Sequence, residues 1–389
     1  MQSFSRIYLD HNASSPLRPE AKAAMLAALG DPLNPSSVHS EGRRGKSLLE
    51  EAREIISRGL GAKPKNVIFT ASATEAANLA LTPTLMRGQD KRPIERFLIA
   101  GGEHPAVFQG HRFSPQAIEI LPLEKNGQLS LNALQAVLTR CSGQKIALAL
   151  QAVNNETGVM QPLEGAGDLI KKEAGIFICD ATQAIGRVEL SLESSHADVL
   201  FFSSHKLGGP AGAGALIFAQ DDLFLQDILI KGGGQEAGRR AGTENIPAIV
   251  GFAAAFQCAL RDLTTEGPRL QQLQQEIEGY LSSIAPSHVV FGQKSPRSPN
   301  TVAFAIPEID SQTLLMALDL AGVAVSSGSA CSSGKVKESH VLKAMGMREK
   351  ISLRISLGWS TTKKEVEEFG IILKNVVRDI HSRRSGPQS

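Results

Sequence analysis

The sequence predicts an α/β fold in which a mainly parallel β-sheet is covered by helices on both faces. Short, almost continuous apolar runs recur through the first two-thirds of the 389-residue chain, with helix-like stretches between them, a pattern typical of buried parallel strands. The composition then changes near Arg261, where a Gln-rich segment begins. Because the chain is too long for one small domain, we expect two domains.

Six apolar segments of the first part predict buried strands. They are residues 67–70, 96–100, 146–152, 176–180, 199–203 and 212–219. Residues 71–81, rich in alanine and without Gly or Pro, predict a helix directly after the first of these strands.

The last third of the chain predicts a smaller α+β domain. Residues 263–281 form an amphipathic helical pattern, and residues 300–305 and 351–356 predict further strands. We therefore assign residues 16–262 to the large domain and residues 1–15 and 263–382 to the small domain. The Gly-, Pro-, Ser- and Arg-rich residues 383–389 are expected to form a disordered tail.

Charge and cysteine usage exclude several classes of protein. The 41 basic and 39 acidic residues give a net charge of +2. The sequence has no basic, aromatic-rich patch, so direct nucleic-acid binding is not expected. The apolar runs are shorter than the ~18 residues that a membrane span needs, and the first ten residues lack a signal core. The four cysteines form no C-x-x-C pair, which argues against zinc or a disulfide scaffold. We expect a cytoplasmic protein without membrane contact.

Lys206 and Asp180 are the first candidate functional residues. Asp180 ends one expected strand and Lys206 follows the next, before a run of glycines, so both side chains are expected at the carboxyl edge of the sheet, where α/β proteins bind ligands. Pyridoxal phosphate (PLP) needs a lysine for its Schiff base and a carboxylate for its pyridinium nitrogen. Taken singly, Lys206 could be a solvated loop lysine and Asp180 a helix cap.

Cys331 and Arg354 are the next candidates. Cys331 lies among small, hydrophilic residues in SSGSACSSG, where a thiol is accessible, whereas Cys141, Cys179 and Cys258 have the apolar surroundings of inert core cysteines. Arg354 lies in an expected strand of the small domain, and its guanidinium suits a carboxylate. The plain alternative for Arg354 is an arginine on an exposed strand face.

Ten sequence blocks, spread almost from end to end and in the family's order, resemble the cysteine desulfurases, class V enzymes of the fold-type I PLP family. The cofactor blocks are DATQAIG (180–186) and FSSHKLGGPAGAG (202–214). The others are YLDHNASSP (8–16), NPSSVH (34–39), TASATEAAN (70–78), GEHPAV (102–107), VNNETG (153–158), GGGQEAGRRAGTENIP (232–247), SSGSACSSG (326–334) and SLRISLG (352–358). The cysteine block resembles the group I branch. HNASSP departs from the usual residues but keeps the hydroxyls. The resemblance implies a seven-stranded sheet in the large domain.

The resemblance also implies roles around PLP. It assigns the Schiff base and proton transfer at Cα to Lys206 and the pyridinium contact to Asp180. The remaining implied roles are ring stacking and proton relay for His104, a hydrogen bond to the phenolic oxygen for Gln183, cofactor and substrate contact for Asn155, and phosphate contacts for Ala73, Thr74, Ser203, His205 and Thr243. Thr243 would act from a second subunit, which implies a homodimer.

For the substrate, the resemblance implies L-cysteine, with Arg354 binding its carboxylate and the Cys331 thiolate receiving its sulfur as a persulfide. The segment 326–339, which has Val336 as its one aliphatic residue beyond alanine, is expected to be mobile. An iron–sulfur scaffold protein or another sulfur acceptor would take the persulfide, and Cys331 would serve as a transient ligand of a nascent cluster.

Three other functions are weighed against this one. A class V aminotransferase needs no loop cysteine, so Cys331 argues against it. A selenocysteine lyase remains open, because selenium and sulfur differ little in shape. A non-catalytic sulfur-pathway adaptor would not need Lys206, Asp180, His104 and Cys331 together.

Overall fold

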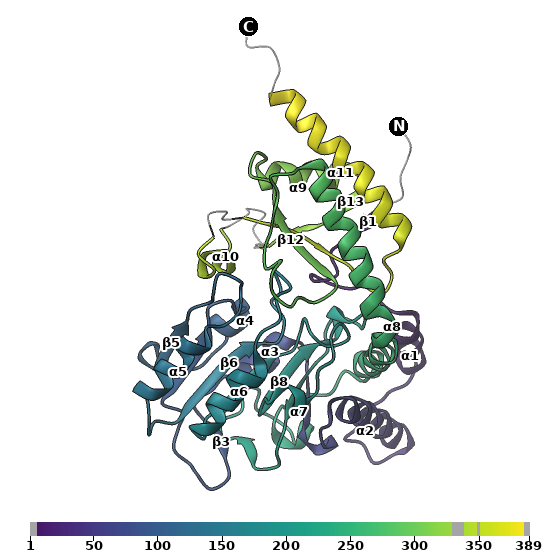
Figure 1. Cartoon of the computed structure of the whole chain (residues 1–389). Helices are drawn as coiled ribbons and strands as arrows, with labels where there is room; N and C mark the ends of the chain where they lie inside the picture. The colour runs from purple at the N-terminus through teal and green to yellow at the C-terminus, as the bar shows by residue number, and fades with distance from the viewer. Residues whose placement is uncertain (1–5, 329–337, 348–350, 385–389) are drawn as a thin grey trace.

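The computed structural model describes residues 6–328, 338–347 and 351–384. Its centre is a seven-stranded sheet, which confirms the predicted fold class (Figure 1). The strand order is β2 (Val67–Thr70), β9 (Gly214–Phe218), β8 (Val199–Ser203), β7 (Ile176–Asp180), β6 (Ile146–Gln151), β4 (Arg96–Ala100) and β5 (Ile118–Leu121).

The sheet is mainly parallel. Strands β8, β7, β6, β4 and β5 pair in parallel, whereas β9 runs antiparallel to both β8 and β2. All residues of β2, β9, β8, β7 and β6 are buried, as expected of a sheet covered on both faces, whereas the edge strand β5 is only partly buried.

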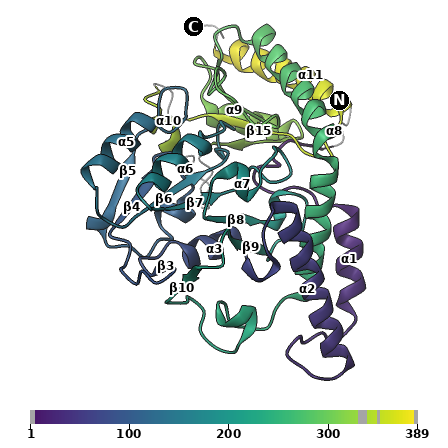
Figure 2. The ribbon, with the colours of Figure 1, turned by 60° about the horizontal axis from the view of Figure 1, so that its bottom comes forward.

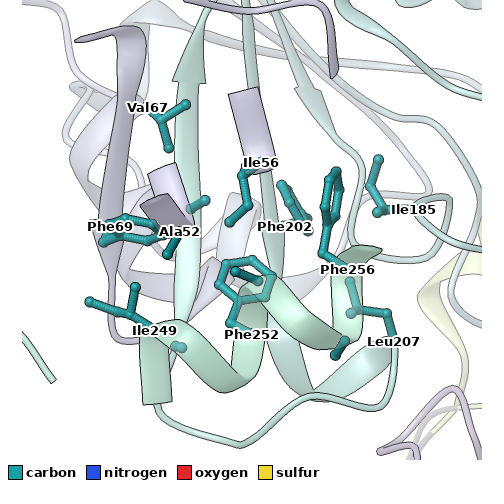
Figure 3. Close-up of a cluster of buried hydrophobic side chains, with 14 of the residues drawn as sticks. Ala52, Ile56, Val67, Phe69, Ile185, Phe202, Leu207, Ile249, Phe252 and Phe256 are labelled. Carbon is teal, nitrogen blue, oxygen red and sulfur yellow. The ribbon is translucent and has the colours of Figure 1, made fainter. Parts of the chain in front are cut away.

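Helices cover both faces because successive strand residues point to opposite sides. In β8, Phe202 packs with α2 (Ser40–Leu60) and α8 (Ile246–Ile284), where Phe252 and Phe256 meet it (Figure 3). The neighbouring Phe201 faces the other side, toward α3 (Ala73–Ala80). The helices α5 (Leu131–Arg140) and α6 (Leu163–Lys172) cover the β4–β6–β7 part of the first face.

The small domain is built on a four-stranded sheet of order β11 (Val289–Val290), β12 (Thr301–Ala305), β15 (Leu353–Ser356) and β14 (Ser326–Ser327). The strand β1 (Ile7–Tyr8) pairs in parallel with β13 (Val323–Ala324), so the beginning of the described chain lies in this domain. The surrounding helices are α9 (Ser311–Leu320), α10 (His340–Ala344) and α11 (Lys363–Arg384).

Helix α8 connects the two parts of the molecule. Its buried residues up to Ala259 belong to the core of the large sheet, and those from Leu270 belong to the core of the small domain, where α8 runs beside α11 (Figures 1 and 2). The expected helix 263–281 is thus the second half of a helix that begins at Ile246, and the assigned boundary at 262/263 lies within it.

Among the described residues, α8 is the one helix that is long and apolar enough to cross a membrane by length and composition. Within its most apolar window, 56% is buried inside the fold. Residues 383 and 384, which the sequence assigned to a tail, belong to α11.

The other α-helices are α1 (Pro19–Leu29), α4 (Pro105–Phe108) and α7 (Leu192–Ser195), and the short strands β3 (Leu85–Arg87) and β10 (Leu223–Leu225) pair with each other.

Candidate active site

A cavity of about 270 Å³ opens at the carboxyl ends of β7 and β8. The parallel pairing places Asp180, the last residue of β7, opposite Phe201 of β8, and the chain leaves β8 through a 3-10 turn that ends at Lys206. The cavity collects ten of the twelve predicted site residues: Ala73, Thr74, His104, Asn155, Asp180, Gln183, Ser203, His205, Lys206 and Arg354.

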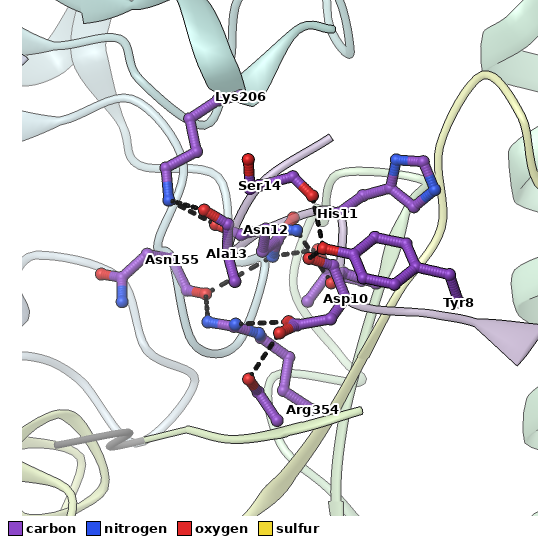
Figure 4. Close-up of polar contacts among 12 residues, drawn as sticks. Tyr8, Asp10, His11, Asn12, Ala13, Ser14, Asn155, Lys206 and Arg354 are labelled. Atoms are coloured by element: carbon purple, nitrogen blue, oxygen red, sulfur yellow. Dashed lines mark hydrogen bonds and ion pairs between the residues drawn. The ribbon is translucent and has the colours of Figure 1, made fainter. Parts of the chain in front are cut away.

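The Lys206 amine is held by main-chain oxygens of the N-terminal segment. Its Nζ donates to the carbonyl oxygens of Asn12 (2.6 Å) and Ala13 (2.8 Å) (Figure 4). Burial, together with the positive charges of Arg354 and Arg187, lowers the pKa of Lys206 to about 7. The amine can therefore exist unprotonated near neutral pH, as a nucleophile or base requires.

Asp180 and His104 face the same cavity, and burial shifts their pKa values in opposite directions. Asp180 is 8% exposed. Burial raises its pKa, and the hydrogen bond from the Thr182 amide (2.9 Å) opposes that rise. The ring of His104 is exposed along the cavity wall, yet the surrounding protein lowers its pKa by desolvation while Asp180 counteracts this. A cation placed against Asp180 would favour its ionised form.

The start of α3 forms one wall of the cavity. The side chain of Ser72 caps the helix by accepting from the Glu75 amide, so the amides of Ala73 and Thr74 begin the helix at the cavity. The first N–H groups of a helix lack partners within it and attract anions. Gly214 of β9 makes this placement possible, because a Cβ there would lie 2.7 Å from the Ser72 carbonyl carbon.

Ser203 and His205 also line the cavity, and Ser203 pairs with Gly214, the residue that lies against this helix start. The pKa of His205 is lowered to about 4 by burial and by Lys206 and Arg187, so its ring is neutral near pH 7. Its Nδ1 lies 3.3 Å from the hydroxyl of Ser14. The two residues supply neutral polar groups, not charge, to this end of the cavity.

Arg354 is a buried arginine of the small domain that reaches the cavity, which rules out the exposed-face alternative. It is 5% exposed. Its Nη1 donates to the Asn155 carbonyl and its Nη2 to Asp10, both at 2.9 Å (Figure 4). Among the described residues, buried Arg354 Nε and buried Asn155 Oδ1 have no partner. Two polar atoms of the site therefore remain available for a polar ligand.

Asn12 is the central residue that the sequence analysis missed. Its side chain donates to Thr301 Oγ1 (2.9 Å) and accepts from Asn300 (3.0 Å), and its carbonyl oxygen also accepts from Gln183 (3.1 Å). Asn12 thereby ties the small domain to the lysine and to Gln183, whose Oε1 also accepts from Arg187. Asn12 and Asp10 both belong to the block YLDHNASSP, which is the signal that could have identified them.

The other two predicted site residues are Thr243 and Cys331. Thr243 is exposed, in the loop before α8, and does not line it. Cys331, with most of the segment expected to be mobile, lies outside the described residues. The other three cysteines are buried and free, as expected.

Comparisons with known proteins agree with this geometry. Residues 7–369 match the family model described as aminotransferase class-V. The chain is 35% identical over 390 residues to the cysteine desulfurase of Trichormus azollae, covering 97% of this chain and 94% of that protein. The chain belongs to the cysteine desulfurases, within the class-V aminotransferase family.

Solved structures extend the likeness to the whole desulfurase fold. The NifS-like protein of Rickettsia africae superposes with a TM-score of 0.86 at 31% identity, covering 96% of this chain and 99% of that one. The structure described as SspA in complex with cysteine has a TM-score of 0.73 at 26% identity, covering 90% and 98%. These findings do not favour the selenocysteine lyase or the non-catalytic adaptor.

Proposed function

We propose that this desulfurase uses PLP on Lys206 to release the sulfur of L-cysteine to Cys331, leaving L-alanine. The observation that carries the proposal is the meeting of Lys206, Asp180 and the start of α3 in one cavity. An amine with a pKa near 7, a buried carboxylate and a helix N-terminus match the aldehyde, ring nitrogen and phosphate of PLP.

The residues of the cavity fit this cofactor by their chemistry. Gly214 allows the helix start to approach the sheet, where Thr74, Ser203 and His205 offer polar groups to the phosphate. Asp180 would face the ring nitrogen, with His104 along the ring and Gln183 toward the phenolic oxygen. When bound, PLP withdraws electrons from the Cα–H bond of an amino acid.

The side chains around the substrate would divide the remaining work. Arg354 would bind the carboxylate of cysteine, using its free Nε or displacing Asp10 from the guanidinium. Lys206 Nζ would accept the Cα proton, as its lowered pKa permits. The Cys331 thiolate would then attack the substrate sulfur, so that a Cys331 S–S bond replaces the substrate's C–S bond. The complex of the related SspA with cysteine supports cysteine as substrate.

Partners and location follow from the same proposal. We propose a homodimer in which Thr243 reaches the neighbouring subunit's cofactor, since Thr243 is exposed and outside its own cavity. The persulfide would pass to an iron–sulfur scaffold or another acceptor, with Cys331 as a transient cluster ligand. The three free cysteines of the described chain support a reducing, cytoplasmic setting.

The deciding experiment compares the protein with its Cys331→Ser variant. With L-cysteine in D₂O, both proteins should exchange the Cα proton, because Lys206 and Asp180 are intact. Alanine and persulfide should form only with Cys331 present, since a hydroxyl cannot take up the sulfur. Cys258→Ala, which removes a buried thiol elsewhere, should behave as the unchanged protein. Persulfide and alanine formation by Cys331→Ser at the unchanged rate would defeat the proposal.

A further inference from the structure

A buried ion pair lies at the free edge of β2, away from the cavity. Arg53 of α2 donates from Nη1 and Nη2 to Glu236 Oε2 (2.7 Å) and Oε1 (3.0 Å). The two residues are 6% and 5% exposed. A pair this deeply buried is costly to desolvate, so its retention calls for a specific use.

The ion pair satisfies main-chain groups at the edge of β2 to which a further strand would otherwise bond. On the edge of β2 that β9 does not cover, Arg53 Nη1 donates to the Val67 carbonyl (2.9 Å) and Glu236 Oε2 accepts from the Phe69 amide (3.0 Å). These two main-chain groups are ones that a neighbouring strand would otherwise satisfy. The guanidinium also lies over the Phe69 ring, 4.9 Å from its centroid. The edge of the sheet is thus closed by two side chains.

The loop that supplies Glu236 is bent to reach this edge. Glu236 and the following Ala237 have φ values of 51° and 54°, a left-handed conformation that is uncommon for non-glycine residues. Arg239 Nε donates back to the Glu236 carbonyl (3.1 Å). Strained backbone persists where surrounding contacts hold it, and here the ion pair holds it.

The same loop presents Thr243. The Gln235 side chain accepts from the Gly242 amide (3.1 Å), and Arg240 pairs with Glu75 in the first turn of α3 (2.8 Å). Contacts at Gln235, Glu236 and Arg240 therefore fix the chain on the approach to Thr243, which is left exposed.

We infer that Glu236, with Arg53, is a positioning residue that anchors the loop 232–245 to the edge of β2 so that Thr243 reaches the partner subunit's site. The inference rests on the proposed dimeric PLP enzyme. Glu236 contacts neither cofactor nor substrate in this arrangement. Its effect appears in the partner's site, not in its own.

Mixed dimers separate these two sites. In the first, one subunit carries Lys206→Ala and the other carries Glu236→Ala, so the one lysine-bearing site receives an intact loop. In the second, one subunit carries both changes and the other is unchanged, so the lysine-bearing site receives the altered loop. The first should retain PLP and activity like a reference dimer of one Lys206→Ala and one unchanged subunit. The second should retain PLP roughly tenfold less firmly, as loss of one charged hydrogen bond implies.

Two further variants serve as controls. Glu50→Gln removes a carboxylate that contacts Arg53 from the exposed side (3.2 Å) without touching β2, and it should match the reference in either arrangement. Glu236→Gln keeps the shape of the side chain while removing its charge. It replaces Glu236→Ala if that variant does not fold, with the same difference between arrangements expected.

Equal PLP retention in the two arrangements, or weaker retention in the first, would overturn the inference. Absence of cysteine-dependent alanine formation by the unchanged dimer would instead defeat the proposed function, so the two failures are distinguishable.

Discussion

At the scale of single residues, the site depends on how burial shifts the pKa values of groups that would otherwise be ordinary. Lys206 is deprotonated more easily than a solvated lysine because its amine is largely removed from water and lies near Arg354 and Arg187. Asp180 is shifted in the opposite direction by the same cause, which favours its neutral form until a cation is placed beside it.

The first prediction concerns the Lys206 amine in the protein without cofactor. Its reductive methylation should rise as pH increases through about 7, because only the unprotonated amine reacts and burial lowers its pKa to about 7. An ordinary lysine, with a pKa of about 10.4, should continue to gain reactivity well above pH 9. Mass spectrometry of the peptide containing Lys206 and of a peptide containing an exposed lysine gives the two curves. A midpoint near 10 for Lys206 would show that its amine is solvated.

The sign of the corresponding stability effect follows from the same shift. Between pH 7 and the ordinary lysine pKa, the unfolded chain binds more protons at Lys206 than the folded chain does. The contribution of Lys206 to the free energy of unfolding therefore increases with pH across this window.

The second prediction concerns Arg354→Lys. This variant should keep PLP but raise the KM for cysteine, since an ammonium lacks the planar fork with which Arg354 can hold Asp10 and the Asn155 carbonyl and present parallel N–H groups to a carboxylate. Loss of a charged hydrogen bond is worth about 1.5–3 kcal/mol, which corresponds to roughly 10- to 150-fold in KM. Steady-state kinetics and the cofactor spectrum measure the two effects separately. An unchanged KM would assign carboxylate binding to another residue.

At the scale of elements, β9 passes close to the start of α3, which forms one wall of the cavity. Gly214 gives β9 no side chain where the Ser72–Ala73 peptide lies against it. Ser72 then caps the helix, and the amides of Ala73 and Thr74 face the cavity.

The third prediction is that Gly214→Ala weakens both the fold and cofactor binding. The added Cβ would lie 2.7 Å from the Ser72 carbonyl carbon and 3.0 Å from the Ala73 nitrogen, so the helix start must move. Overpacking of this kind costs about 1–3 kcal/mol, and the PLP dissociation constant should rise as well. Thermal unfolding and PLP titration measure both effects.

Gly279→Ala is the matched control, because nothing lies within 4 Å of a Cβ added at this exposed position in α8. Replacing a helical glycine there should stabilise the protein by about 0.5–1 kcal/mol without changing PLP affinity. If Gly214→Ala behaved like Gly279→Ala, the close approach of strand and helix would not matter for the site.

At the scale of the whole molecule, the site is shared between distant parts of the chain. Arg354 and Asn12 connect the small domain to Asn155 and Lys206 of the large one. The proposed dimer adds a second source of residues, because Thr243 is exposed and lies outside the cavity of its own chain.

The fourth prediction therefore concerns Thr243→Ala. The variant should remain dimeric but bind PLP roughly 10- to 150-fold less tightly, the range expected for one lost hydrogen bond to a charged phosphate. Thr243→Ser keeps the hydroxyl and should bind as the unchanged protein does. Light scattering and PLP titration separate assembly from binding. Unaltered PLP affinity in the alanine variant would exclude Thr243 from the partner's phosphate site.

The sequence by itself determined the residue types of the site and six of the seven strands of the large sheet; it missed the edge strand β5, which is only partly buried and has no continuous apolar run. Apolar runs such as residues 176–180 and 199–203 coincide with β7 and β8, because burial on both faces of a parallel sheet demands such runs. The positions of Asp180 and Lys206 at the ends of these strands then followed from the way parallel strands align their carboxyl ends.

Only the tertiary structure decided which distant groups meet these residues. The Asn12 and Ala13 carbonyls at Lys206, and Asp10 at Arg354, are separated from their partners by about half of the chain or more. The spacing of apolar residues along the sequence does not predict such contacts, since they arise from the packing of one domain on the other. The helix 246–284 likewise crosses the point where the composition changes, because a helix continues wherever its backbone hydrogen bonds and buried face allow, whichever core it packs against.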